Sequence, residues 1–407
     1  MKRTARINLI LDTLAGNGEA GFSGDGGPAR SALLNEPKGV CFDRQGNLFI
    51  ADSENHVVRR VDRGTGIITT VAGRYPSGVP ASPARFMEEK EEDEDPFAEP
   101  SSDRSKAYSQ VTDLSGTVRY VMGGGVAVSR YAGDGGPASR ALLNFPSAVA
   151  VDETGHVYIA DTMNHRVRKL DATTGVLSTL AGTGQPRYQG DGGPASSASL
   201  NEPSALVIDG DILYIADQSN NCVRAVDLTT GIITTIAGNG TASYNGDGIP
   251  ATGANLAGPS GLALAPGHVL VIADTFNNRV RAVDRSTGLI STWAGDGEAY
   301  RYQGTDEPPS RSISRPTGIA VAGDGAILIT DSDSHLIRRY DRTTQTVTRL
   351  AGNGAAQYGG DGGDALEGHL SYPFGVAVDA SGSIAVADTF NHRVRVLRRG
   401  MEGSSAC

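Results

Sequence analysis

The stretch ADTMNHRVRK at residues 160–169 decides the fold, because five variants of it recur along the chain. The other copies are ADSENHVVRR at 51–60, ADQSNNCVRA at 216–225, ADTFNNRVRA at 273–282, TDSDSHLIRR at 330–339 and ADTFNHRVRV at 387–396. Their aspartates are separated by 109, 56, 57, 57 and 57 residues, and are Asp52, Asp161, Asp217, Asp274, Asp331 and Asp388. A fixed period of this length indicates a repeat architecture.

One copy, residues 201–238, shows what each repeat contains. It holds two apolar runs joined by a Gly-Asp turn, then an alternating segment, then a β-branched segment, at 204–209, 212–216, 222–227 and 232–237. These are four strand patterns joined by tight turns, and no copy has the 3.6-residue period of a helix. Four-stranded units in radial array are the blades of a propeller. The sequence therefore predicts an all-β, six-bladed β-propeller of four-stranded antiparallel blades.

The two ends of the chain fit closure of the propeller. The last copy stops after its third strand pattern, whereas residues 7–16 (INLILDTLAG) resemble the fourth-strand pattern at 67–73 (IITTVAG). We expect the N-terminal strand to complete the final blade, because this removes an open sheet edge. The sequence thus predicts a single propeller domain over residues 1–400 and a disordered tail at 401–407.

The long first interval has more than one explanation. Residues 87–100 (MEEKEEDEDPFAEP) carry eight acids and one lysine, a composition that cannot bury enough apolar surface to fold. We expect a mostly disordered acidic insert at 74–130 with one strand near its end. A decayed seventh blade is the alternative, since residues 113–123 (DLSGTVRYVMG) mimic the end of a normal copy. We favour it less because residues 74–110 show no credible strand pattern. Translated non-coding sequence is a third explanation.

Net charge, cysteine content and apolar runs limit the classes of partner that we expect. The net charge of −10 comes mostly from the acidic stretch, and the near-neutral remainder offers no basic field for nucleic acid. The three cysteines show no CxxC spacing and are expected to be reduced thiols. No signal peptide or transmembrane run is recognisable, so we expect a soluble protein, cytoplasmic by default, with no membrane partner.

Residues that recur in every copy are predicted to be structural, since a catalytic residue usually occurs once. Each repeated aspartate is expected to accept backbone N–H bonds in the turn that follows it. The Asn-His or Asn-Asn pairs of that turn lie a blade width apart and cannot converge on a metal. The third-strand arginines are expected to pack between blades against a carboxylate. They are Arg59, Arg168, Arg224, Arg281, Arg338 and Arg395.

A GDGGPA loop precedes most copies. It occurs at 24–29, 133–138 and 190–195, in altered form at 246–251 and 360–365, and is lost at 304–308. Glycines around an aspartate suggest calcium, but one acid per loop is too few for an ion that takes six or more oxygens. We interpret each loop as a tight turn ordered by its aspartate.

The entry to each innermost strand is the place where the copies differ. The varying pairs are Glu36/Lys38, Phe145/Ser147, Glu202/Ser204, Gly258/Ser260, Arg315/Thr317 and Tyr372/Phe374. Variation among otherwise similar copies is where a binding site is easiest to build, although drift at exposed loop positions would look the same. We predict a ligand site at the channel mouth formed by Glu36, Lys38, Phe145, Glu202, Arg315, Tyr372 and Phe374.

The motifs resemble the NHL repeat family, named for an Asn-His-Leu turn that reads NHV, NHR, NNC, NNR, SHL and NHR here. The surrounding elements, P-x-G-V-A-V-D, Y-I-A-D-T-x-N-H-R-V-R and T-G-x-I-x-T-x-A-G-x-G, support it over nearly everything outside residues 74–130. The resemblance implies a six-bladed propeller that serves as an interaction platform. Related amidating lyases and gluconolactonases hold zinc or calcium in the channel, but no matching ligand set is recognisable in this sequence.

We therefore expect a non-enzymatic binding scaffold whose channel mouth and loops take a protein or peptide. No catalytic residue, metal ligand or cofactor is assigned. Two alternatives stay open: a metal-dependent hydrolase or lyase with zinc or calcium in the channel, and a sensor domain of a larger extracellular or envelope protein.

Overall fold

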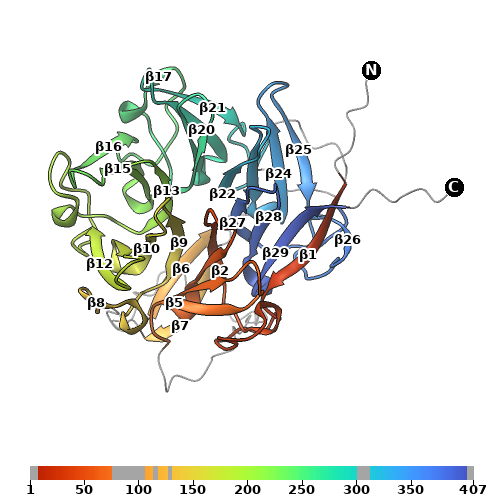
Figure 1. Ribbon diagram of the computed structural model, residues 1–407. Helices are drawn as coiled ribbons and strands as arrows, with labels where there is room; N and C mark the ends of the chain where they lie inside the picture. The colour runs from red at the N-terminus through yellow and green to blue at the C-terminus, as the bar shows by residue number, and fades with distance from the viewer. Residues whose placement is uncertain (1–7, 76–105, 113–117, 127–130, 300–311, 401–407) are drawn as a thin grey trace, which may run out of the picture.

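Six four-stranded antiparallel sheets stand around a central axis as the blades of a propeller, as the sequence predicted (Figure 1). The computed structural model describes residues 8–75, 106–112, 118–126, 131–299 and 312–400. Among these residues, no helix has the length and apolar character needed to cross a membrane.

The strands of each blade run in order from the channel outward. Blade 1 holds β2 (Pro37–Phe42), β3 (Leu48–Asp52), β4 (Val57–Val61) and β5 (Ile68–Ala72). Blade 2 holds β9 (Pro146–Val151), β10 (Val157–Asp161), β11 (Arg166–Leu170) and β12 (Val176–Ala181), and blade 3 holds β13 (Pro203–Asp209), β14 (Ile212–Asp217), β15 (Cys222–Asp227) and β16 (Ile233–Ala237).

The other three blades repeat the same order. Blade 4 holds β18 (Pro259–Ala265), β19 (Val269–Asp274), β20 (Arg279–Asp284) and β21 (Leu289–Ala294), and blade 5 holds β22 (Pro316–Val321), β23 (Ile327–Asp331), β24 (Leu336–Asp341) and β25 (Thr346–Ala351). Blade 6 holds β27 (Pro373–Val378), β28 (Ile384–Asp388), β29 (Arg393–Arg399) and β1 (Leu9–Ala15). Two-residue strands β8 (Gly136–Pro137), β17 (Ile249–Pro250) and β26 (Gly363–Asp364) extend blades 2, 4 and 6.

In the part of the insert between blades 1 and 2 that the structure describes, there is no seventh blade. It carries β6 (Lys106–Thr112) and β7 (Val118–Val126), which pair only with each other as a separate two-stranded sheet. The sequence predicted one strand here, and β6 went unrecognised because its pattern is short and largely polar. The disorder expected elsewhere in the insert and in the tail concerns residues 76–105, 113–117, 127–130 and 401–407, which lie outside the described residues.

The hydrophobic core lies between blades, in six clusters that each join two neighbours. In one of them Tyr158 of blade 2 packs with Leu206 and Ile215 of blade 3. Small residues let the innermost strands approach closely. A Cβ atom on Gly39 would lie 2.4 Å from the carbonyl oxygen of Ser147, and one on Gly375 would lie 2.4 Å from that of Lys38.

The N-terminal strand closes the ring. β1 pairs antiparallel with β29, so the first and last strands of the chain lie side by side in blade 6 (Figure 1). Leu9 and Leu11 are buried in the cluster between blades 5 and 6, and Ala15 is buried in the cluster between blades 6 and 1. One strand thus contributes apolar contacts to two blade interfaces.

A buried aspartate and arginine organise each repeat. In blade 2 the carboxylate of Asp161 accepts the backbone N–H of Asn144 at 2.7 Å, the side-chain amide of Asn164 at 2.9 Å and the Arg168 guanidinium at 3.0 Å. The backbone donor precedes the innermost strand rather than lying in the following turn, which corrects the sequence-based expectation. Burial raises the pKa of Asp161, whereas these hydrogen bonds and the arginine lower it. The net pKa is about 6, so the carboxylate is ionised at neutral pH.

The aspartate of the GDGGPA loop binds the same arginine from its exposed end. Asp25 accepts from Arg59 at 2.8 Å and Asp191 from Arg224 at 2.6 Å, whereas the arginine side chains themselves are 0% exposed. In the five blades whose loop is described, both carboxylates on the arginine therefore belong to its own repeat, not to a neighbouring blade. In blade 5 the corresponding loop falls outside the described residues, and the Arg338 guanidinium lies 3.9 Å from Asp331.

The histidine of the NH turn joins consecutive blades. His56 of blade 1 accepts the backbone N–H of Phe145 in blade 2 through Nδ1 at 3.1 Å, and His392 of blade 6 accepts that of Glu36 in blade 1 at 3.2 Å. Blades 3 and 4 use the side-chain oxygens of Asn221 and Asn278 in the same way. An acceptor Nδ1 must carry no proton, so the bond requires neutral imidazole.

Deleting residues 1–16 removes β1 and exposes one face of two blade interfaces. We expect the melting temperature to fall by at least about 5 °C, because several buried apolar side chains lose their partners. Deletion of residues 1–7 alone keeps β1 and is the matched control, with an unchanged melting temperature expected. Equal melting temperatures for both deletions would contradict a closing role for β1.

Acidification tests the histidine bonds. Burial lowers the pKa of His165 and His392 below the ordinary value of 6.5, so the folded protein favours neutral imidazole. Stability from these bonds is complete above that ordinary value and is lost as the pH falls below it. The buried aspartates, whose pKa values are raised, respond in the opposite sense, so a comparison with a variant is needed.

The double variant His165→Asn/His392→Asn supplies the amide acceptor that blades 3 and 4 already use, without a titrating group. We expect melting temperatures similar to wild type near pH 7.5. Between about pH 7.5 and 5.5 wild type should lose at least about 2 °C more than the variant. Parallel pH profiles of thermal unfolding would show that these imidazoles do not act as neutral acceptors.

Candidate functional site at the channel mouth

Six residues occupy one structural position at the mouth, each directly before the proline that opens an innermost strand. All have a left-handed backbone, with φ between 46° and 56°, and they are Glu36, Phe145, Glu202, Gly258, Arg315 and Tyr372. Only one of the six is glycine, although glycine adopts this conformation most easily. The hydrogen bond from the preceding blade holds each backbone in place. We call these six residues the entry ring.

Two residues farther into each innermost strand, most of the side chains are hydroxyls that donate to a backbone carbonyl of the next blade. The hydroxyl of Ser147 donates to the carbonyl of Ser204 at 3.2 Å, and that of Thr317 donates to the carbonyl of Phe374 at 3.2 Å. Blades 6 and 1 lack such a hydroxyl. There Lys38 places its Nζ 6.0 Å from the ring centre of Phe374, so this cation–π pair replaces the hydroxyl bonds at one sector of the mouth.

A second ring of varying side chains was missed in the sequence. It consists of the middle residue of the three-residue 3-10 turn that follows the second strand of each blade: Glu54, Met163, Ser219, Phe276, Asp333 and Phe390. A signal was available, since this position varies more between the six copies than the residues on either side of it. It was not predicted as a site because the turn as a whole is expected to be structural. We call these six residues the turn ring.

The two rings contact each other in blades 3, 4, 5 and 6. Ser219 donates its hydroxyl to Glu202 at 2.7 Å, and the Tyr372 and Phe390 ring centres lie 4.9 Å apart. In blade 4 the entry residue Gly258 has no side chain, and the Phe276 ring occupies that space. A Cβ on Gly258 would lie 2.4 Å from the ring. Each blade thus presents a pair of side chains whose chemistry differs from that of the other blades.

An acidic pair marks the blade 1 sector. Burial and, to a smaller extent, the nearby Glu36 raise the pKa of Glu54 to about 7, and Lys38 opposes this rise. Burial also raises the pKa of Glu36, which is 9% exposed, and Lys38 again opposes the shift. At neutral pH the pair therefore holds a proton for part of the time, and it can both donate and accept a hydrogen bond.

Aromatic and basic groups mark the opposite sector. Phe276 is 57% exposed, and the Arg315 guanidinium lies 5.4 Å from its ring centre. The Nε of Arg315 is also 3.9 Å from the carboxylate of Asp333. This sector offers an apolar face with a cation held over it, which suits an aromatic or anionic group.

The repeated aspartates and histidines lie apart from one another, each within its own blade. In the described ranges, no three His, Cys, Asp or Glu side chains gather closely enough to hold a metal ion. Asp52, Asp161, Asp217, Asp274, Asp331 and Asp388 are all completely buried. The predicted mouth residues lie at the entry to the innermost strands. The turn histidines contact them there, whereas the repeated aspartates are buried within the blades.

Comparison with solved structures supports the architecture. A protein of unknown function from Bacteroides thetaiotaomicron matches with a TM-score of 0.60 at 17% identity, covering 96% of this chain and 76% of that one. A gluconolactonase from Xanthomonas campestris matches with a TM-score of 0.51 at 12% identity, covering 90% and 87%. Likeness at such low identity shows the fold alone.

Comparison with protein families and curated proteins goes further. A family model described as NHL repeat matches residues 143–170, 314–340 and 370–397, and one described as Teneurin NHL domain matches residues 14–86. Protein SUPPRESSOR OF QUENCHING 1, chloroplastic, from Arabidopsis thaliana is 31% identical over 275 residues, covering 64% of this chain and 26% of the relative. Human NHL repeat-containing protein 2 is 29% identical over 290 residues, covering 64% and 39%.

This chain thus spans well under half the length of those two relatives. The matched segments fall on blades whose order and closure agree with the repeat pattern of the sequence. The chain therefore contains NHL repeats, which the family model matches in blades 2, 5 and 6 of its six-bladed propeller.

Proposed function

We propose that this propeller is a non-enzymatic binding module whose channel mouth takes a peptide segment of a protein partner. One observation carries the proposal: six backbone positions held in the same conformation carry Glu, Phe, Glu, Gly, Arg and Tyr. A frame that repeats while its side chains differ provides a rigid, asymmetric surface. Such a surface loses little conformational entropy on binding.

The chemistry of the two rings favours an extended peptide over a small apolar ligand. Acids lie at blades 1 and 3, aromatic rings at blades 2, 4 and 6, and a cation at blade 5, where Arg315 lies near Phe276. Aromatic side chains and arginine are the residues that most often dominate binding energy at interfaces. A peptide with a basic and an apolar residue in alternation would meet complementary groups across the mouth.

A catalytic alternative rests on Glu54 and Glu36. A carboxyl with a pKa of about 7 is suited to general acid–base work, and this pair faces the same mouth. Metal analysis of the purified protein separates a metal-dependent hydrolase or lyase from the binding module. Stoichiometric zinc or calcium that resists dialysis would favour the enzyme.

The binding proposal is tested with short linear peptides selected from a random library against the wild-type protein. The mouth variant is Glu36→Asn/Glu202→Asn/Arg315→Asn, because asparagine tolerates the left-handed backbone while removing the charges. The control variant Arg44→Asn/Glu153→Asn/Asp211→Asn removes two acids and one base from the turns at the other end of the innermost strands. Circular dichroism and thermal melting check that both variants fold.

We expect the selected peptides to bind the mouth variant at least about tenfold more weakly than wild type, and the control variant with unchanged affinity. Isothermal titration calorimetry measures both. Peptides that bind the mouth variant as tightly as wild type would place the site elsewhere and contradict the proposal.

A further inference from the structure

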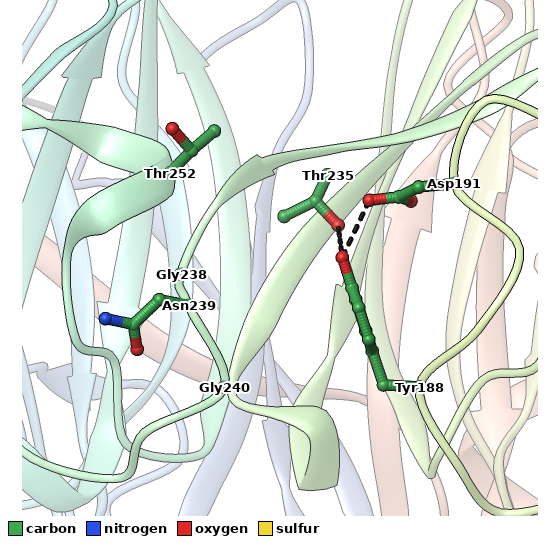
Figure 2. A pocket seen from close by; sticks show the side chains of 7 residues that line it. All are labelled: Tyr188, Asp191, Thr235, Gly238, Asn239, Gly240 and Thr252. Carbon is green, nitrogen blue, oxygen red and sulfur yellow. Dashed lines mark hydrogen bonds between the residues drawn. The ribbon is translucent and has the colours of Figure 1, made fainter.

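A hollow opens beside the outer strand of blade 3, away from the mouth. It is lined by Tyr188, Asp191, Thr235, Gly238, Asn239, Gly240 and Thr252. Figure 2 shows Tyr188 on one side of it and the segment from Gly238 to Gly240 on the other. The Tyr188 hydroxyl is fixed by Asp191 at 2.7 Å and Thr235 at 2.9 Å, while the residue is 52% exposed.

Three other blades fill this same place with an arginine from the start of their third strand. In blade 2, the guanidinium of Arg166 lies 3.6 Å from the ring centre of Tyr131. It donates to the carbonyls of Asn164 at 2.9 Å and Thr183 at 2.7 Å. It also lies over Gly184, where an added Cβ would be 2.1 Å from its Nη1.

Blades 4 and 6 repeat this arrangement. Arg279 lies 3.9 Å from the ring centre of Tyr244, donates to the carbonyls of Asn277 and Asp296, and covers Gly297. Arg393 lies 3.6 Å from that of Tyr358. The recurring receptor is therefore an aromatic face, two backbone carbonyls and a glycine that leaves room.

Blade 3 keeps the receptor and lacks the arginine. Its third strand begins with Cys222, a short and buried side chain. Tyr188 and Gly240 are retained, and a Cβ on Gly240 would meet only the Asn220 carbonyl, at 3.9 Å. Tyr188 contacts the deeper Arg224 at 4.9 Å, as its counterparts contact theirs, but among the described residues no second guanidinium lies over its ring.

Blades 1 and 5 show no unfilled receptor of this kind among the described residues. In blade 1 the Tyr75 ring stacks on Phe22, with ring centres 4.7 Å apart and planes 9° apart. In blade 5 the corresponding aromatic position lies outside the described residues. Within the described chain, blade 3 is thus the one blade with a formed but unfilled arginine receptor.

We propose that the blade 3 hollow binds the guanidinium of an arginine side chain supplied by another protein or peptide. A guanidinium is planar, so it stacks on the tyrosine while its N–H groups reach two carbonyls, which a compact ammonium does less well. This site is separate from the mouth and does not rest on the function proposed there.

The probe is N-acetylarginine methylamide, with the citrulline and lysine analogues as comparisons. Citrulline keeps the shape and loses the charge. Cys222→Arg fills the hollow from within, as in blades 2, 4 and 6, and should fold with an equal or higher melting temperature. Tyr188→Ala removes the stacking face. Tyr244→Ala is the matched control, because Arg279 already fills the receptor in blade 4.

We expect ligand-observed NMR titration to show millimolar binding of the arginine probe to wild type and to Tyr244→Ala. Cys222→Arg and Tyr188→Ala should bind it at least about tenfold more weakly, and wild type should show a similar preference over citrulline. The proposal is overturned if citrulline binds equally, if wild type shows no binding, or if Cys222→Arg retains full binding. Should Cys222→Arg fail to fold, the comparison of Tyr188→Ala with Tyr244→Ala decides.

Discussion

The hydrogen bond between one blade's imidazole or amide and the next blade's backbone N–H is the contact on which the channel mouth depends. It acts six times around the ring, from His56 to Phe145 and finally from His392 to Glu36. It fixes a backbone conformation that most residues avoid, and it does so at the point where the chain enters each innermost strand. Without it, neither the position nor the direction of the entry ring would be the same in every blade.

The repeated aspartates and arginines hold the segment that carries this contact. Asp161 holds the residue that begins the entry segment, and Arg168 and the loop aspartate Asp134 complete the buried charges. A buried guanidinium has five N–H donors, more than one carboxylate can accept, so a second acid on it is expected on physical grounds, and the described residues show one in five blades. This explains why the GDGGPA loop recurs although it holds too few oxygens for calcium. Its aspartate is one half of an ion pair.

Much of the fold could be predicted because each blade is a local unit. Strand patterns, tight turns and the fourth-strand pattern at residues 7–16 all lie within short windows, and the structure places β1 where they indicated. The partners of the recurring side chains were harder to predict. Asp161 bonds to a residue 17 positions earlier and His165 to one 37 positions later, and such pairs depend on how blades are aligned.

The candidate site was predicted only in part for the same reason. Glu36, Lys38 and Phe374 lie together at one sector because neighbouring blades meet there, which the variation between copies indicated. Glu54 went unnoticed because it lies inside a recurring motif. The hollow beside Tyr188 has a different signal, the absence of a repeated residue. It is recognised only when Cys222 is compared with the arginines at the same position in other blades.

The most direct measurement of this account is the protonation state of the turn histidines by long-range nitrogen–proton NMR at neutral pH. The account requires His56, His165, His335 and His392 to carry their proton on Nε2, with an unprotonated Nδ1. It further predicts scalar coupling across the hydrogen bond from each Nδ1 to the backbone nitrogen of the next blade's entry residue. A proton on Nδ1, or imidazolium in any of the four, would contradict it.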